Sequence, residues 1–103
     1  MKNNIKIGII GLGYVGFPLL INLKKKFSVF GYDKNEEIIN RNSTLKNFIS
    51  NKPDNLITCN VFIITVPTPV NSKKLPDLSL IKNASKLVAK YLKHKDIVIY
   101  EST

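Results

Sequence analysis

Three glycines spaced as G-x-G-x-x-G stand at residues 11–16, directly after the apolar run of residues 5–10. A pyrophosphate needs backbone N–H groups and the positive end of a helix at close range, so side chains must be absent where the chain turns toward it. Gly11 and Gly13 meet this need, and Gly16 would let the following helix pack closely on the strand. The spacing therefore predicts the phosphate cradle of a dinucleotide.

An acidic residue lies where such a cradle needs one. Asp33 follows Gly11 by twenty-two residues, at the end of a β-prone run, and can accept hydrogen bonds from a ribose 2′-hydroxyl. A carboxylate there repels a 2′-phosphate, which favours NAD over NADP. The alternative is a purely structural glycine turn in which Asp33 only caps the second helix.

No set of side chains predicts a reaction. His94 has no second histidine beside it, the acidic residues are scattered, and Cys59 is the only cysteine and lies just before an apolar run. We expect His94 on the surface at a helix end and Cys59 in the core, with no metal site and no internal disulfide. The residues alone predict a unit that binds a nucleotide, and they do not predict a reaction.

The elements that would position these residues alternate between strand and helix. Strands are expected at residues 5–10, 28–33, 45–50, 60–66 and 96–101, and helical segments at 14–26, 34–42, 53–58 and 78–93. Asp77 is the expected N-cap of the last helix, and Pro67 and Pro69 end the fourth strand and begin a fixed loop.

This alternation predicts an α/β fold, a Rossmann-like doubly wound parallel sheet of about five strands in the order 3-2-1-4-5. Ligands of such sheets lie outside the carboxyl ends of the strands, near the point where the strand order reverses. Residues 11–16, Asp33, the loop of residues 67–69 and the pair 102–103 are all expected at that edge.

Composition limits the possible functions. A length of 103 residues gives room for one small domain, and 44% hydrophobic with 22% charged residues is ordinary for a globular protein. No apolar run approaches the roughly 20 residues of a spanning helix, and the first residues lack the apolar region of a signal peptide. We therefore expect a cytoplasmic protein with no membrane partner.

The formal charge of +9 raises the question of nucleic acid. The lysines do not form one dedicated patch: three end the first helix at residues 24–26, two lie in a loop at residues 73–74, and Lys82, Lys86, Lys90 and Lys93 follow one face of the last helix. We expect these faces to be solvated and nucleic-acid binding to be absent.

Four motifs together carry a resemblance to a known family. They are IIGLGYVGFPL at residues 9–19, TVPTPV at 65–70, PDL at 76–78 and YEST at 100–103. With these four motifs in this order, the chain resembles the UDP-glucose/GDP-mannose dehydrogenase family over nearly its whole length. Within the family, the second and fourth motifs are most similar to enzymes that oxidise UDP-N-acetylgalactosamine or UDP-N-acetylglucosamine.

The resemblance implies two successive NAD-dependent oxidations that convert a sugar C6 alcohol into a carboxylate, through a thioester on a cysteine, for polysaccharide synthesis. It also implies a set of NAD contacts: Gly11, Gly13, Tyr14, Val15, Gly16, Asp33, Thr68 and Thr103. Thr103 further matches the threonine that helps to position the catalytic water.

The chain also departs from the family pattern. Ile38 stands where the family usually has an arginine beside the adenosine, and residues 42–45 look shortened. The catalytic cysteine with its lysine and asparagine, the central dimerising helix and the UDP-binding domain all fall beyond the last motif. We therefore expect residues 1–103 to form a truncated NAD-binding domain, a fragment or decayed copy that binds NAD weakly or not at all and is inactive alone.

Two other interpretations remain open at this stage. One is a free-standing module that binds NAD or a protein partner without catalysis. The other is a basic protein that uses the fold to bind polyanions.

Overall fold

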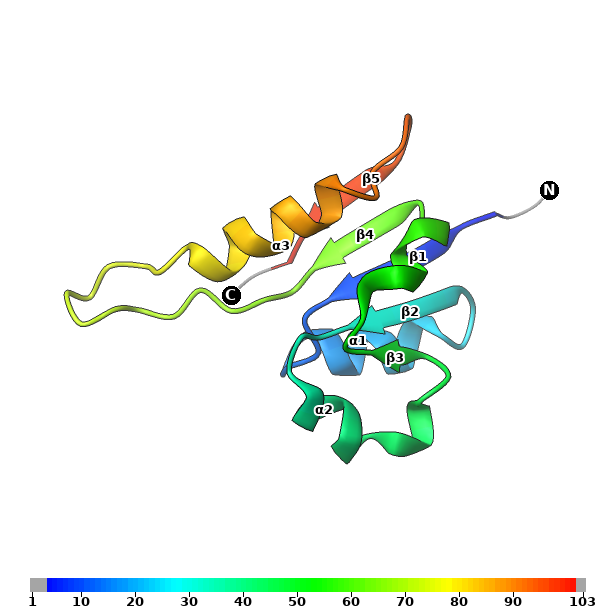
Figure 1. Cartoon of the computed structure of the whole chain (residues 1–103), viewed down its shortest axis with the longest axis horizontal. Helices are drawn as coiled ribbons and strands as arrows, with labels where there is room; N and C mark the ends of the chain where they lie inside the picture. Colours follow the sequence, from blue (N-terminus) through cyan, green and yellow to red (C-terminus); the bar gives the residue numbers. More distant parts are fainter. Residues whose placement is uncertain (1–3, 102–103) are drawn as a thin grey trace.

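A five-stranded parallel sheet organises the computed structural model, which describes residues 4–101 (Figure 1). The strands are β1 (Lys6–Ile10), β2 (Ser28–Tyr32), β3 (Ile49–Ser50), β4 (Val61–Ile64) and β5 (Ile97–Tyr100). Their order is β3-β2-β1-β4-β5, as the alternation of strands and helices predicted. The fold is therefore a Rossmann-like α/β domain with the reversal of strand order between β1 and β4.

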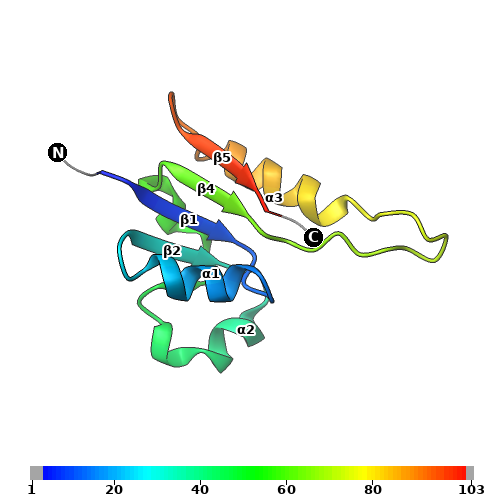
Figure 2. The ribbon, with the colours of Figure 1, turned by 180° about the vertical axis from the view of Figure 1, so that it is seen from behind.

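Helices cover both faces of this sheet. On one face lie α1 (Gly16–Leu23) and α2 (Glu36–Arg41), and on the other lies α3 (Ser79–Ala89). Two 3₁₀ helices, η1 (Ser43–Leu45) and η2 (Pro53–Thr58), flank the short β3. Viewed from behind, α1 lies in front of β1 and β2, while β5 forms the opposite edge (Figure 2).

The core has two halves because successive strand residues point to opposite faces. Ile9 and Ile63 pack with Leu20 beneath α1, whereas Phe62 and Ile64 pack with Val88 beneath α3. Cys59 belongs to the second half and is buried, as expected. Burial raises the pKa of its thiol, and the nearby Lys93 ammonium offsets part of that rise.

Several elements are shorter than the sequence predicted. The third strand was expected over residues 45–50, but residues 43–45 form η1, and only Ile49 and Ser50 pair with β2. The first helix begins at Gly16 rather than residue 14, because residues 13–15 form the turn. It ends at Leu23, after which Lys25 and Lys26 donate to carbonyls three residues back in a tightened last turn.

The prediction for the end of α3 was wrong in part. The helix stops at Ala89 instead of residue 93, so Lys93 is exposed but does not share a helix face with Lys82 and Lys86. Its ammonium lies 3.2 Å from the Asp96 carboxylate and donates to the Cys59 carbonyl at 2.9 Å. This side chain therefore ties the segment after α3 to the residues that precede β4.

The loop after β4 forms a fixed arm, as the two prolines predicted. Val70 and Pro76 pair in an antiparallel bridge, and the Asn71 side chain accepts hydrogen bonds from the N–H groups of Lys73 and Leu75. The predicted N-cap is off by one residue: Leu78 is the N-cap of α3, and Asp77 before it accepts from the Ser79 N–H at the first helical residue. The arm projects from the carboxyl edge of the sheet (Figure 1).

One expectation about the surface is confirmed. His94 is exposed after the end of α3. Across residues 4–101, none of the helices has the length and apolar character needed to cross a membrane.

The two-sided core predicts the effect of a matched pair of substitutions. Ile64→Val removes a methylene from a buried position, so we expect it to lower the free energy of unfolding by about 0.5–1.5 kcal/mol. Ile57→Val makes the same change on an exposed side chain and should alter it by less than about 0.5 kcal/mol. Urea unfolding followed by circular dichroism measures both, and equal effects would contradict this packing.

Candidate cofactor site

The glycine turn joins β1 to α1 through a tightly fixed backbone. Gly11 has a φ of 104°, which favours glycine, and its N–H donates to the Tyr32 carbonyl at 2.8 Å. A Cβ on Gly16 would overlap the Gly11 carbonyl oxygen. Gly16 is therefore required for α1 to approach β1, as the sequence predicted.

Gly13 differs from these two glycines. Its φ is not in the left-handed region, and a Cβ built on it would have no atom within 4 Å. Neither packing nor backbone conformation requires glycine here. The absence of a side chain instead keeps a space outside the chain open.

Backbone N–H groups are available at this space. Among residues 4–101, the N–H groups of Gly13, Tyr14, Val15 and Gly16 have no acceptor. No side chain caps the start of α1, and its first turn contains no acidic residue. These unpaired donors at the positive end of a helix form an anion-binding geometry.

Thr65, at the end of β4, holds the turn in place. Its buried hydroxyl donates to the Gly11 carbonyl at 2.6 Å and lies 3.2 Å from the Ile10 carbonyl, which already accepts from the Thr65 N–H. The Gly11 carbonyl has no other donor among the described residues. Sequence reasoning placed Thr65 in a motif but gave it no role; its one signal was a hydroxyl at the end of a buried strand.

Asp33 joins the glycine turn to the start of α2. One carboxylate oxygen accepts from the Leu12 N–H and the other from the Asn35 N–H, both at 2.9 Å. It does not cap α2, because Asn35 is the N-cap and accepts from the Glu37 N–H. Each carboxylate oxygen retains a second lone pair, so Asp33 can still accept hydrogen bonds from a ligand.

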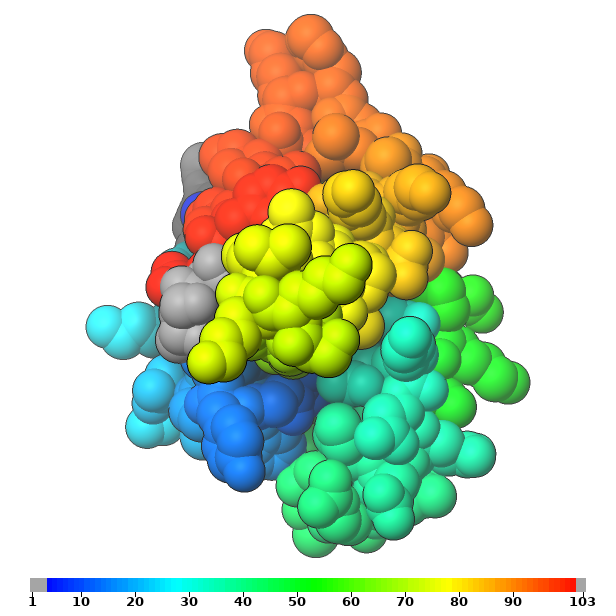
Figure 3. All heavy atoms as spheres, turned by 90° about the vertical axis from the view of Figure 1, so that its left-hand side faces the viewer, coloured from blue at the N-terminus to red at the C-terminus, as the bar shows by residue number. Residues whose placement is uncertain are grey.

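One pocket of about 570 Å³ brings the main predicted residues together. Gly11, Gly13 and Asp33 line it with Thr65 and with one side of α3, and Figure 3 shows this carboxyl edge end-on behind the arm. Most of the lining from α3 is apolar, including Leu80, Ala84 and Leu87. The pocket thus combines a polar turn with an apolar wall, which suits a nucleotide.

The other expected contacts are placed less directly. Tyr14 is fully exposed in the turn, Val15 precedes α1, and Thr68 lies in the loop after Pro67 without lining the pocket. Thr103 is outside the described residues. Ile38, at the position of the family's usual arginine, lines the pocket with an apolar side chain.

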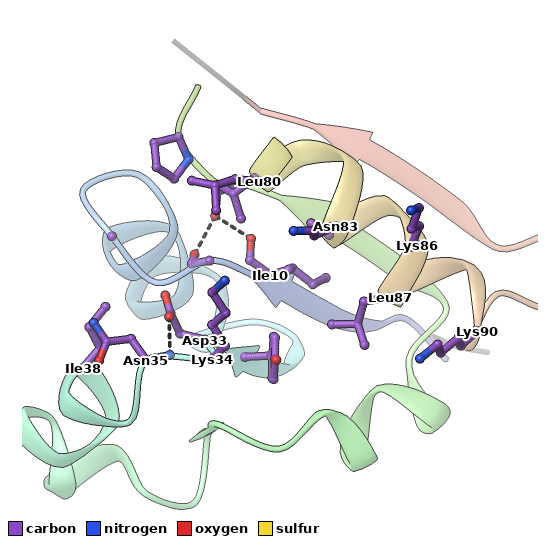
Figure 4. A pocket seen from close by; sticks show the side chains of 17 residues that line it. Ile10, Asp33, Lys34, Asn35, Ile38, Leu80, Asn83, Lys86, Leu87 and Lys90 are labelled. Carbon is purple, nitrogen blue, oxygen red and sulfur yellow. Dashed lines mark hydrogen bonds between the residues drawn. The ribbon is translucent and has the colours of Figure 1, made fainter. Parts of the chain in front are cut away.

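Sequence reasoning also missed the cations at the pocket rim. Lys34 follows Asp33, Lys86 belongs to α3 and Lys90 directly follows that helix, and Lys34 and Lys90 approach the pocket from opposite sides (Figure 4). Tyr32 lines the same pocket, and the pKa of its phenol is raised by burial, with the Asp33 charge adding to the rise. The phenol therefore stays neutral. Within residues 4–101 no cluster of His, Cys, Asp or Glu could hold a metal ion.

Comparison with known proteins agrees with this geometry. The model of the UDP-glucose/GDP-mannose dehydrogenase family, NAD binding domain, matches residues 39–103, more than half of the chain. The chain belongs to this family. Its domain is the NAD-binding domain, and NAD is its cofactor.

Individual relatives match over almost the whole chain. A UDP-N-acetyl-D-glucosamine 6-dehydrogenase of Pseudomonas aeruginosa is 43% identical over 117 residues, covering 97% of this chain and 28% of the relative. One from Salmonella typhi is 38% identical, covering 98% and 28%. The structure of a UDP-D-ManNAc dehydrogenase from Pyrococcus horikoshii superposes with a TM-score of 0.85 at 31% identity, covering 96% and 28%. The chain thus spans a little over a quarter of these relatives.

The role of Thr65 predicts a clear difference between two substitutions. Thr65→Val keeps the shape but leaves the buried Gly11 carbonyl without a donor, so we expect a loss of about 1–3 kcal/mol in the free energy of unfolding. Thr65→Ser keeps the hydroxyl and should lower the free energy of unfolding clearly less. Urea denaturation compares them, and a Thr65→Val variant as stable as the parent would refute this role.

Proposed function

We propose that this chain forms the amino-terminal, NAD-binding part of a nucleotide-sugar 6-dehydrogenase that acts on a UDP-N-acetylhexosamine. The observation that carries the proposal is the open space at Gly13, in the same turn as the unpaired N–H groups of residues 13–16. The substrate class is supported by the relatives from Pseudomonas aeruginosa and Salmonella typhi, which are named UDP-N-acetyl-D-glucosamine 6-dehydrogenases.

Two regions of the pocket would bind different parts of the cofactor. The N–H groups of residues 13–16 would bind the pyrophosphate, and the remaining lone pairs of Asp33 would accept hydrogen bonds from the adenosine ribose. The apolar wall from α3 offers a surface for the adenine ring. Tyr14, Val15, Thr68 and Thr103 are the further proposed contacts.

Bound NAD would supply the hydride acceptor for oxidation of the sugar at C6. Among the described residues, Cys59 is enclosed in the core beneath α3 and His94 lies away from the pocket, so neither provides a nucleophile or base there. We propose that the cysteine and lysine of the reaction come from outside this chain, with Thr103 positioning water. The 103-residue chain alone would then not turn over a UDP-sugar.

The proposed reaction also suggests a location and a strength of binding. NAD and nucleotide sugars are cytoplasmic metabolites, which supports a cytoplasmic site of action. Ile38 replaces a cation beside the adenosine with an apolar side chain, so we propose that this chain binds NAD weakly.

Gly13 allows the function to be tested without disturbing the fold. Gly13→Val fills the open space, so we expect NAD binding to fall by at least about tenfold while the melting temperature stays within about 2 °C of the parent. Ser28→Val adds the same side chain at the exposed, opposite end of the sheet and should leave NAD binding unchanged.

Isothermal titration calorimetry with NAD measures the affinities. The proposal fails if the parent chain does not bind at millimolar NAD, or if Gly13→Val binds as well as the parent. Submicromolar binding by the parent would contradict the proposed weak affinity.

A further inference from the structure

Asn83 interrupts the apolar side of α3 that faces the cofactor pocket. Residues three and four apart share one face of a helix, and Leu80, Asn83 and Leu87 line the pocket in this spacing. Figure 4 shows the Asn83 side chain extending from α3 toward the side of the pocket that carries Asp33 and Lys34. A ligand that packs on this side of α3 therefore covers the amide.

The amide of Asn83 is free to bind a ligand. Within residues 4–101 this side chain has no hydrogen-bond partner. Other polar groups of the pocket are already engaged: the Thr65 hydroxyl donates to the Gly11 carbonyl, and the Asn35 side chain accepts from the Glu37 N–H. The lysines at the rim can donate hydrogen bonds but cannot accept them. The Asn83 amide offers both, because its oxygen accepts and its nitrogen donates.

Asp33 brings the base of the cofactor to this amide. Its proposed ligand is the adenosine ribose, which carries the adenine directly on its ring. The same pocket extends from Asp33 to α3, where Leu80 and Leu87 contribute to its apolar wall. An adenine packed on that wall covers Asn83, which lies between the two leucines on the helix. Burying an amide without hydrogen bonds is costly, so the edge of the base has to supply them.

We propose that Asn83 hydrogen-bonds the edge of the adenine, which makes it a specificity-determining residue of the cofactor site. Adenine carries its 6-amino donor beside a ring-nitrogen acceptor, and an asparagine amide matches such a pair with two hydrogen bonds. The Asn83 oxygen accepts from the amino group, and its nitrogen donates to the ring nitrogen. This inference rests on the proposed NAD binding and adds the residue that recognises the base.

Tyr32 is the other candidate for this contact. Its phenol lines the same pocket, is neutral and has no hydrogen-bond partner within residues 4–101. A single phenol oxygen cannot pair with two neighbouring atoms of a base, as a planar amide does. The paired donor and acceptor of adenine therefore favour Asn83 over Tyr32.

Nuclear magnetic resonance of the side-chain amides tests the contact directly. The NH₂ signals of Asn83 are assigned by their absence from Asn83→Leu. They should shift on titration with NAD and with ADP-ribose, which carries the adenine without the nicotinamide. Nicotinamide mononucleotide lacks the adenine and should leave them unshifted. The NH₂ signals of Asn22, which is exposed on α1 and does not line the pocket, should not respond to any of the three.

An analogue of the cofactor tests the hydrogen bonds themselves. In 1,N⁶-etheno-NAD a ring closes over the 6-amino group and N1 of the adenine, so the amino donors are lost. The ratio of the dissociation constants of this analogue and NAD should be at least about threefold larger for the parent than for Asn83→Leu. Asn22→Leu makes the same change on α1 and should keep the parent's ratio. Asn83→Leu should not lower the melting temperature, because the Asn83 amide has no partner within residues 4–101.

The outcomes separate this inference from the proposed function. If the parent binds neither NAD nor ADP-ribose at millimolar concentration, both are overturned. If the parent binds them while the Asn83 signals stay unshifted, or if the parent and Asn83→Leu show equal ratios, only the role of Asn83 is overturned. A ratio that falls in Tyr32→Phe and not in Asn83→Leu would assign the contact to the phenol and also overturn it.

Discussion

The close approach of α1 to the carboxyl end of β1 is the constraint on which the cofactor site depends. Only hydrogen fits at Gly16 against the Gly11 carbonyl, and that carbonyl also accepts from the Thr65 hydroxyl, which lies close to the same position. Because packing and this hydrogen bond fix the turn, the N–H groups of residues 13–16 remain unpaired at a defined position.

Asp33 extends this constraint from the turn to the next strand. Its carboxylate accepts from the Leu12 and Asn35 N–H groups, so Asp33 and the glycine turn are parts of one hydrogen-bonded unit. The NAD-binding domain of this family is thus preorganised by contacts made within the chain. The groups for the oxidation itself are not among the residues that line the pocket.

The features that the sequence predicted well are those with local chemical causes. The glycine spacing, Asp33, the prolines after β4 and the alternation of strands and helices led to the strand order and to the edge that carries the site. The errors came from tertiary contacts that periodicity does not contain. Lys93 contacts Asp96 and the Cys59 carbonyl in the segment after α3, and Thr65 gains its role only because β4 lies beside β1. Lys86 and Lys90 lie at the rim because α3 packs beside the pocket.

Nuclear magnetic resonance of the backbone amides tests the central claim, that the fixed turn donates its unpaired N–H groups to the cofactor's phosphates. On titration with NAD at millimolar concentration, the largest ¹⁵N–¹H shift changes should fall on Gly13, Tyr14, Val15 and Gly16, and Gly13→Val should abolish them. Shift changes confined to other parts of the chain, or absent from these four amides while NAD binds, would contradict this account.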